Sequence, residues 1–160
     1  MASSRDPVRD VLRIDYHVEA FPAGDEECLL IVPRVFVNRR NLLEDCTLDL
    51  RELVMSTRVE GECWLLICGC GTQGCGVDRP VEVSHCGESV RWEVPESLRS
   101  RSTTGAVRTY SFDRATYVAT VAAALLQAQN LAQQSGSASE IGPHGFEIEE
   151  LLGLDPVPSP

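Results

Sequence analysis

The sequence contains no lysine, because all 14 basic residues among its 160 are arginine. A lysine amine is needed to form a Schiff base with a carbonyl substrate, and the phosphate-binding P-loop also requires one. Both kinds of site are therefore excluded.

Histidine is scarce, and the three present are His17, His85 and His144. His17 falls on the polar side of a predicted strand, and His144 lies between glycine and proline residues in a predicted linker. The chain has neither the G-x-S-x-G turn of serine hydrolases nor the H-E-x-x-H motif of zinc proteases. We therefore expect a non-enzymatic protein-interaction or binding domain.

Long apolar runs are also missing, since none approaches the roughly 18–20 residues that a membrane helix needs. The first residues lack the apolar core of a secretory signal. These absences predict a cytoplasmic protein with no membrane partner. In that compartment the seven cysteines are expected to be thiols.

The charge is strongly acidic, with 24 Asp and Glu residues and a net charge of -10. Such a surface repels nucleic-acid phosphates, so a nucleic-acid partner is excluded. The same charge would steer a protein partner with a basic surface.

Several segments show strand patterns. Residues 12–20 alternate between apolar and polar side chains, as a half-buried strand does. In a second strand, residues 28–37, Pro33 cannot donate a backbone hydrogen bond and requires an edge position or a break. Residues 63–68 are nearly all apolar, which predicts a central strand buried on both faces.

A hairpin is predicted around the turn Gly87-Glu88, and a last strand over residues 107–112. The hairpin register places core-facing residues opposite each other. The expected pairs are Val81 with Val94, Val83 with Trp92, and His85 with Val90.

Two helices are predicted. Leu50, Leu53 and Val54 have helical spacing, and Thr47 is a suitable N-cap for a helix over residues 48–57. Asp113 is expected to cap a long alanine-rich helix that ends near residue 134. The order of elements predicts an α+β fold, a largely antiparallel sheet of about five to six strands with both helices on one side.

The composition divides the chain into one domain and its flanks. The expected segments are a flexible lead (1–10), an α+β domain (11–134), a Ser/Gly-rich linker (135–145), a short docking segment (146–154) and a disordered tail (155–160). Because a strand buried on both faces needs more cover than two helices supply, a homodimer is also expected.

The cysteine-rich turn over residues 68–75 is the most distinctive feature. Glycines allow it to fold tightly, so that Cys68, Cys70 and Cys75 can converge as zinc ligands. A fourth ligand is not evident, because His85 and Cys86 are expected in the hairpin core. Structural thiols and a Cys70–Cys75 disulfide remain alternatives to zinc.

Arginines flank two predicted loops. Arg99, Arg101 and Arg108 lie in or beside a loop over residues 95–106, and Arg39 and Arg40 lie in another turn. Either group could bind an anion or the carboxylates of a partner. A cleft between the 95–106 loop and the sheet is the place expected for a small-molecule enzyme site, the remaining alternative.

The cysteine turn also carries a resemblance. Trp64 followed by the C-x-C-G-x-x-G-C pattern of residues 68–75 resembles a motif of uncharacterised bacterial proteins. In that family the motif is followed by a V-x-W segment, here residues 90–92, and by an F-D-x-x-x-Y helix start, here residues 112–117. The resemblance implies a single bacterial domain and brings no activity, cofactor or catalytic residue with it.

Overall fold

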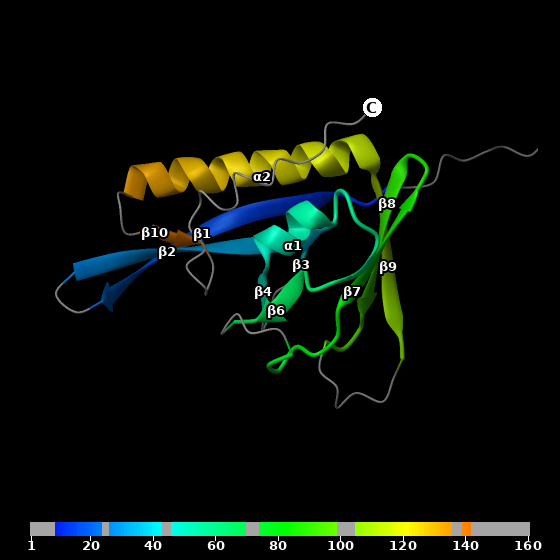
Figure 1. Ribbon diagram of the computed structural model, residues 1–160, viewed down its shortest axis with the longest axis horizontal. Helices are drawn as coiled ribbons and strands as arrows, with labels where there is room; N and C mark the ends of the chain where they lie inside the picture. Colours follow the sequence, from blue (N-terminus) through cyan, green and yellow to red (C-terminus); the bar gives the residue numbers. More distant parts are fainter. Residues whose placement is uncertain are drawn as a thin grey trace, which may run out of the picture.

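The structure, a computed structural model, is an α+β fold, as the sequence predicts. Within its described residues the chain forms ten strands and two helices, and the strands form three sheets instead of one. Figure 1 shows the β1–β2 sheet under the long helix, the β7–β9 sheet at the other end, and β4–β6 between them. The described residues are 9–23, 26–42, 46–69, 74–98, 105–135 and 139–141.

The first sheet is built on two long strands, β1 (Leu12–Ala23) and β2 (Glu26–Val37), which pair antiparallel along their whole length. The short strands β3 (Arg40–Asn41) and β10 (Ser139–Ile141) pair with the other edge of β2. β10 runs parallel to β2 and lies within the stretch predicted as a linker. The predicted alternation in β1 is confirmed near its start, where the side chains of Leu12 and Ile14 are buried.

Pro33 lies inside β2 without breaking it. The carbonyl of Val35 accepts a bond from the backbone N–H of Leu42, just beyond β3, so odd-numbered residues of β2 direct their backbone groups to this edge. Along that edge β10 pairs with β2 as far as Ile31, and β3 pairs with β2 at Phe36 and Val37. Among the described residues, Pro33 therefore lies between the two short strands, where neither strand needs its missing N–H.

Hydrogen bonds at the turn between β2 and β3 connect the first four-stranded sheet to the second. Asn38 and Arg39 both have positive φ, 50° and 69°, as a type I′ turn requires. The Asn38 amide donates to Asp10 Oδ1 (2.6 Å), and Asp10 Oδ2 accepts from the Ser111 N–H (2.6 Å) in the second sheet. These two bonds hold Asp10, the last residue of the predicted flexible lead, in place. Residues 1–8 of that lead lie outside the described residues.

The second sheet has the order β5 (Gly61–Cys63), β7 (Val81–Cys86), β8 (Ser89–Pro95) and β9 (Val107–Asp113), all antiparallel. The predicted hairpin register is confirmed, since Val83 pairs with Trp92 and His85 with Val90. The loop is Gly87-Glu88, and Gly87 has a φ of 59°.

The predicted central strand over residues 63–68 is wrong. Cys63 ends β5, whereas Leu66 begins β6 (Leu66–Cys68), which pairs with β4 (Cys46–Leu48) in a separate two-stranded sheet. Leu65, between the two strands, is fully buried. The exposed fractions of Leu66 and Ile67 are only 1% and 2%. Because one chain already covers these residues, the reason for expecting a dimer no longer holds.

The short helix α1 (Leu50–Met55) is capped by Asp49 and not by Thr47. Asp49 Oδ1 accepts bonds from the backbone N–H groups of Arg51 (2.9 Å) and Glu52 (3.1 Å). Thr47 belongs to β4, so its side chain lies two residues too early to cap. Leu50, Leu53 and Val54 face the core, as their spacing predicts.

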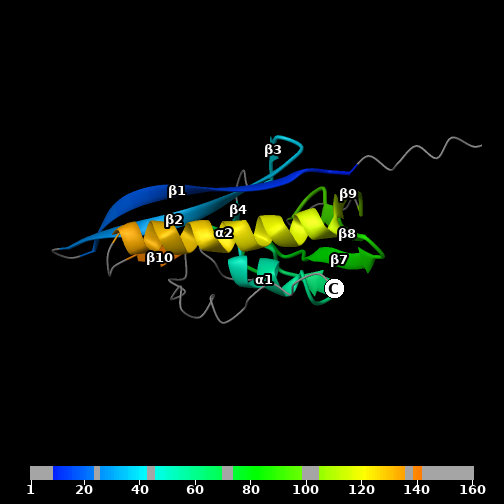
Figure 2. The ribbon, with the colours of Figure 1, turned by 90° about the horizontal axis from the view of Figure 1, so that it is seen from above.

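The long helix α2 (Arg114–Ser135) begins after Asp113, whose Oδ1 accepts from the Thr116 N–H (2.8 Å), as the sequence predicts. It lies along β1 and β2 with α1 beside it (Figure 2). At its start the Tyr117 ring packs on those of Trp92 and Phe112, at centroid distances of 5.8 and 5.6 Å. α2 therefore joins both four-stranded sheets into one core.

Two predicted segments lie outside the described residues: the docking segment 146–154 and the tail 155–160. Within the described part of the chain, no helix is long and apolar enough to cross a membrane.

Candidate functional site

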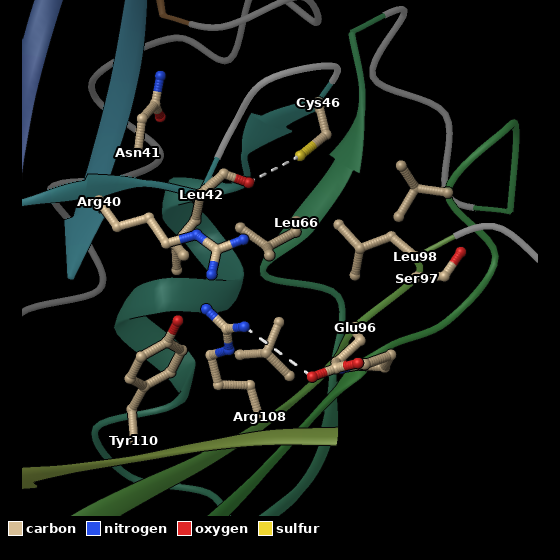
Figure 3. Close-up of a pocket in the computed structure, with 13 residues that line it drawn as sticks. Arg40, Asn41, Leu42, Cys46, Leu66, Glu96, Ser97, Leu98, Arg108 and Tyr110 are labelled. Atoms are coloured by element: carbon tan, nitrogen blue, oxygen red, sulfur yellow. Dashed lines mark hydrogen bonds and ion pairs between the residues drawn. The ribbon is translucent and has the colours of Figure 1, made fainter. Parts of the chain in front are cut away.

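A pocket of about 440 Å³ lies where the two four-stranded sheets and the β4–β6 pair meet. Its walls come from β3 and the residues after it, from β4 and β6, and from the facing ends of β8 and β9 (Figure 3). The polar and charged lining residues are Arg40, Asn41, Cys46, Glu96, Ser97, Arg108 and Tyr110.

Arg40 enters the pocket from the first sheet. It follows the type I′ turn directly, and its guanidinium points into the pocket in Figure 3. The ion pairs formed within the described part of the chain do not include Arg40. Its charge is therefore available to a ligand.

Arg108 enters from the second sheet, on β9, and its guanidinium lies near that of Arg40 in Figure 3. Glu96 Oε1 is 3.9 Å from Arg108 Nη2, and both side chains are about half exposed, at 51% and 43%. An ion pair this long and exposed is weak, so Glu96 compensates Arg108 only in part.

Tyr110 forms the base of the pocket beside the arginines. Its side chain is 6% exposed, and its phenol oxygen points into the space between Arg40 and Arg108 (Figure 3). Burial raises the pKa of the Tyr110 phenol, and the positive charge of Arg40 acts against that rise. Tyr110 therefore stays protonated near neutral pH and can donate a hydrogen bond.

Part of the lining is apolar: Leu42 lies beside Arg40, and Leu66 and Leu98 lie to the right of the arginines in Figure 3. Cys46 also lines the pocket, and its thiol donates to the Leu42 carbonyl at 3.7 Å. The pocket thus combines a charged part with an apolar part, which suits a ligand that carries an acidic group on a partly apolar body.

The predicted zinc ligands are only partly described. Cys68 ends β6 and is half-buried, Cys75 is exposed, and Cys70 lies outside the described residues. In the described part of the chain, no three His, Cys, Asp or Glu side chains are grouped as a metal site would need. The zinc site at Cys68, Cys70 and Cys75 therefore stays a prediction.

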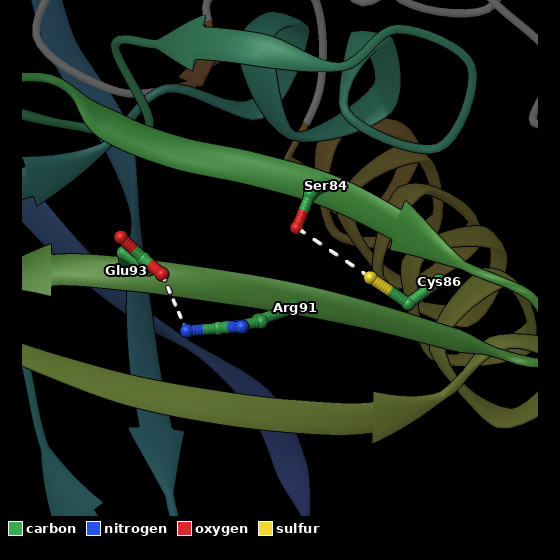
Figure 4. A network of polar contacts seen from close by, with 4 residues as sticks. All are labelled: Ser84, Cys86, Arg91 and Glu93. Carbon is green, nitrogen blue, oxygen red and sulfur yellow. Dashed lines mark hydrogen bonds and ion pairs between the residues drawn. The ribbon is translucent and has the colours of Figure 1, made fainter.

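His85 and Cys86 have other surroundings. His85 Nε2 is 2.9 Å from the Ser56 carbonyl, and its backbone N–H donates to Glu60. Cys86 is exposed, so its expected place in the hairpin core is wrong. Figure 4 shows it beside Ser84 on the same sheet face as the Arg91–Glu93 ion pair (2.5 Å).

Sequence reasoning noted Arg40 and Arg108 separately but did not bring them together. They are far apart in the chain and belong to different sheets, and no local pattern reports that meeting. The sequence also did not predict that Cys46 lines the pocket. Its one signal is that it is a cysteine, like Cys68 of the cysteine turn, with which it pairs.

Comparison with known proteins adds no relative: no family model matches the chain, and no curated protein or solved structure is significantly similar to it.

Proposed function

We propose that the protein is a non-enzymatic binding domain that holds an anionic group of its ligand between Arg40 and Arg108. The observation that carries this proposal is a local reversal of charge. The chain has a net charge of -10, yet the charged pocket residues are two arginines and one glutamate, a net charge of +1.

The position of the two guanidiniums supports the proposal. They come from different sheets and point into one space, where like charges repel each other and an anion between them relieves the repulsion. A guanidinium also presents several donors in one plane, which suits a carboxylate or a phosphate.

The net charge of -10 fits the same function. It repels small anions at long range, so a ligand that also contacts the apolar lining is expected to bind more tightly than a small anion alone. A partner with a basic surface, as the net charge predicts, would be steered to the molecule and could place one acidic group in the pocket.

Thermal unfolding with inorganic phosphate as the probe tests the anion site. A ligand that binds only the folded state stabilises it by about 2 kcal/mol at roughly thirty times its Kd. We expect a saturable rise in Tm for the wild type, measured against sodium chloride of equal ionic strength. Arg40→Ala and Arg108→Ala should each lose most of this rise.

Arg91→Ala is the matched control, because Arg91 pairs with Glu93 on β8 outside the pocket. It should keep the full phosphate response. If all three variants respond as the wild type does, phosphate acts only through general salt effects and the anion site is wrong.

A further inference from the structure

The β4–β6 pair places two cysteines directly opposite each other, Cys46 on β4 and Cys68 on β6. Opposite residues in an antiparallel pair direct their side chains to the same face of the sheet. The structure has both residues as thiols, and both are half-buried, within reach of a small reagent.

The hydrogen-bond pattern shows which kind of pair they form. The Asp49 N–H donates to the Leu65 carbonyl at 2.9 Å, one step beyond the pair Leu48–Leu66, so Asp49 and Leu65 form a hydrogen-bonded pair. Hydrogen-bonded and non-hydrogen-bonded pairs alternate along the ladder. Three steps away, Cys46 and Cys68 therefore form a non-hydrogen-bonded pair.

This kind of pair brings the two cysteines within the range of a disulfide. Its Cα atoms lie about 4.5 Å apart, whereas disulfides span Cα distances of about 4.4–6.8 Å. The thiols now point elsewhere: Cys46 bonds the Leu42 carbonyl, and Cys68 Sγ lies 3.7 Å from where a side chain on Gly76 would begin. Rotation of the side chains, without movement of the strands, is enough to bring the sulfurs together.

We propose that Cys46 and Cys68 form an intramolecular disulfide when the protein meets oxidised glutathione. One thiolate attacks a glutathione sulfur and releases the first reduced glutathione, which leaves a mixed disulfide. The second thiolate attacks the protein sulfur of that mixed disulfide and releases the other glutathione. The two cysteines lose two protons and two electrons in all, and one glutathione disulfide becomes two thiols.

The disulfide has a consequence at the pocket, although it does not depend on what the pocket binds. Cys46 lines the pocket, and its thiol proton, which now bonds the Leu42 carbonyl, is lost on oxidation. The lining of the pocket at Cys46 and Leu42 therefore changes when the disulfide forms.

Peptide mapping of the full chain tests the proposal, because the absence of lysine makes trypsin cut only after arginine. The peptide over residues 41–51 then contains Cys46 alone, and the peptide over residues 59–91 contains Cys63, Cys68, Cys70, Cys75 and Cys86. After treatment with oxidised glutathione and alkylation of the remaining thiols, we expect mass spectrometry to show most of the first peptide linked to the second.

Cysteine variants identify the partner of Cys46. Cys68→Ser should abolish the link, whereas Cys70→Ser and Cys75→Ser should keep it. Circular dichroism checks that each variant is folded. If a variant does not fold, the peptide map of the wild type still tests whether Cys46 is linked to the 59–91 peptide.

Two results would overturn the proposal. One is a disulfide confined to the 59–91 peptide, as Cys70–Cys75 would give, with Cys46 alkylated. The other is zinc bound by the purified protein at about one ion per chain, with Cys46 and Cys68 protected from both oxidation and alkylation until a chelator removes the metal.

Discussion

Cys63 differs from Cys46, Cys68, Cys75 and Cys86 because its side chain is buried, at 4% exposure. Burial raises the pKa of its thiol from the ordinary value near 9 to about 11, and the negative charges of Glu52 and Glu82 add to the rise. The thiol therefore stays protonated at neutral pH, which makes it a poor nucleophile. Cys63 is therefore expected to react with oxidised glutathione more slowly than the half-buried Cys68, which lies in the same tryptic peptide over residues 59–91.

The raised pKa predicts a loss of stability in alkaline solution. Between pH 9 and 11 the folded state keeps a proton that the unfolded chain has lost, so the contribution of Cys63 is complete below pH 9 and disappears as the pH rises through 11. The free energies of unfolding of the wild type and Cys63→Ala should be measured in urea at about pH 8 and about pH 10.5. The advantage of the wild type should shrink by about 1–2 kcal/mol at the higher pH.

The comparison with Cys63→Ala is essential, because burial also raises the pKa of the Tyr16 and Tyr117 phenols. Desolvation is the largest cause of both rises and is present in both proteins, so most of their contributions cancel; the charge of Cys63 is the last and smallest cause of the Tyr117 rise. An advantage that is the same at both pH values would mean that the Cys63 thiol ionises as it does in the unfolded chain.

The start of α1 offers a prediction at the scale of one element. Thr47 and Asp49 are both buried, but the Asp49 carboxylate caps the helix, whereas Thr47 Oγ1 has no hydrogen-bond partner among the described residues. Asp49→Ala should lower the free energy of unfolding by about 1 kcal/mol or more. Thr47→Val keeps the shape of the side chain, removes an unsatisfied hydroxyl and should be neutral or stabilising.

Urea unfolding of both variants measures the difference. A loss on Thr47→Val together with no loss on Asp49→Ala would place the helix start two residues earlier, as the sequence pattern suggested.

Elements with a periodic pattern and a clear boundary residue could be predicted. The alternation in β1, the register of the β7–β8 hairpin and the cap at Asp113 each follow from local chemistry. The segment over residues 63–68 could not, because an apolar run indicates burial and not the strand to which each residue belongs. Leu65 is fully buried between β5 and β6 without belonging to either strand.

At the scale of the whole molecule, Asp10 joins the two four-stranded sheets. One carboxylate oxygen accepts from Asn38 in the β2–β3 turn and the other from the Ser111 N–H on β9. Asp10→Ala removes two hydrogen bonds to a charged group and should lower the free energy of unfolding by about 2–3 kcal/mol. Since Arg40 directly follows this turn and Arg108 lies on the same strand as Ser111, the variant should also weaken the phosphate response of the pocket.

Asp15→Ala is the control, because Asp15 forms an exposed ion pair with Arg13 on β1 alone, at 3.1 Å. Loss of that pair should change stability by less than about 1 kcal/mol. Equal effects of the two variants in urea unfolding would show that the Asp10 carboxylate does not hold the two sheets together.

The pocket could be predicted only in parts. The sequence marked Arg40 and Arg108 as residues of two loops, because arginines in turns are accessible to anions. Their convergence depends on how one sheet is placed against the other, and contacts between distant segments such as Asp10 and Ser111 decide that placement. The opposition of Cys46 and Cys68 likewise depends on a register that short, irregular strands do not reveal in their sequence.

The parallel pairing of β10 with β2 bears on how the chain folds. Glu140 pairs with Leu30, and the whole second sheet and α2 are encoded between them. On the ribosome, the β1–β2 hairpin can form early from local contacts, but the part of this edge at Leu29–Ile31 stays open until β10 has been synthesised. Closing so long a loop is slow, so we expect β10 to dock after the rest of the fold has formed. Until then this part of the edge of β2 is exposed to other chains, and the fold is most prone to aggregate during that interval.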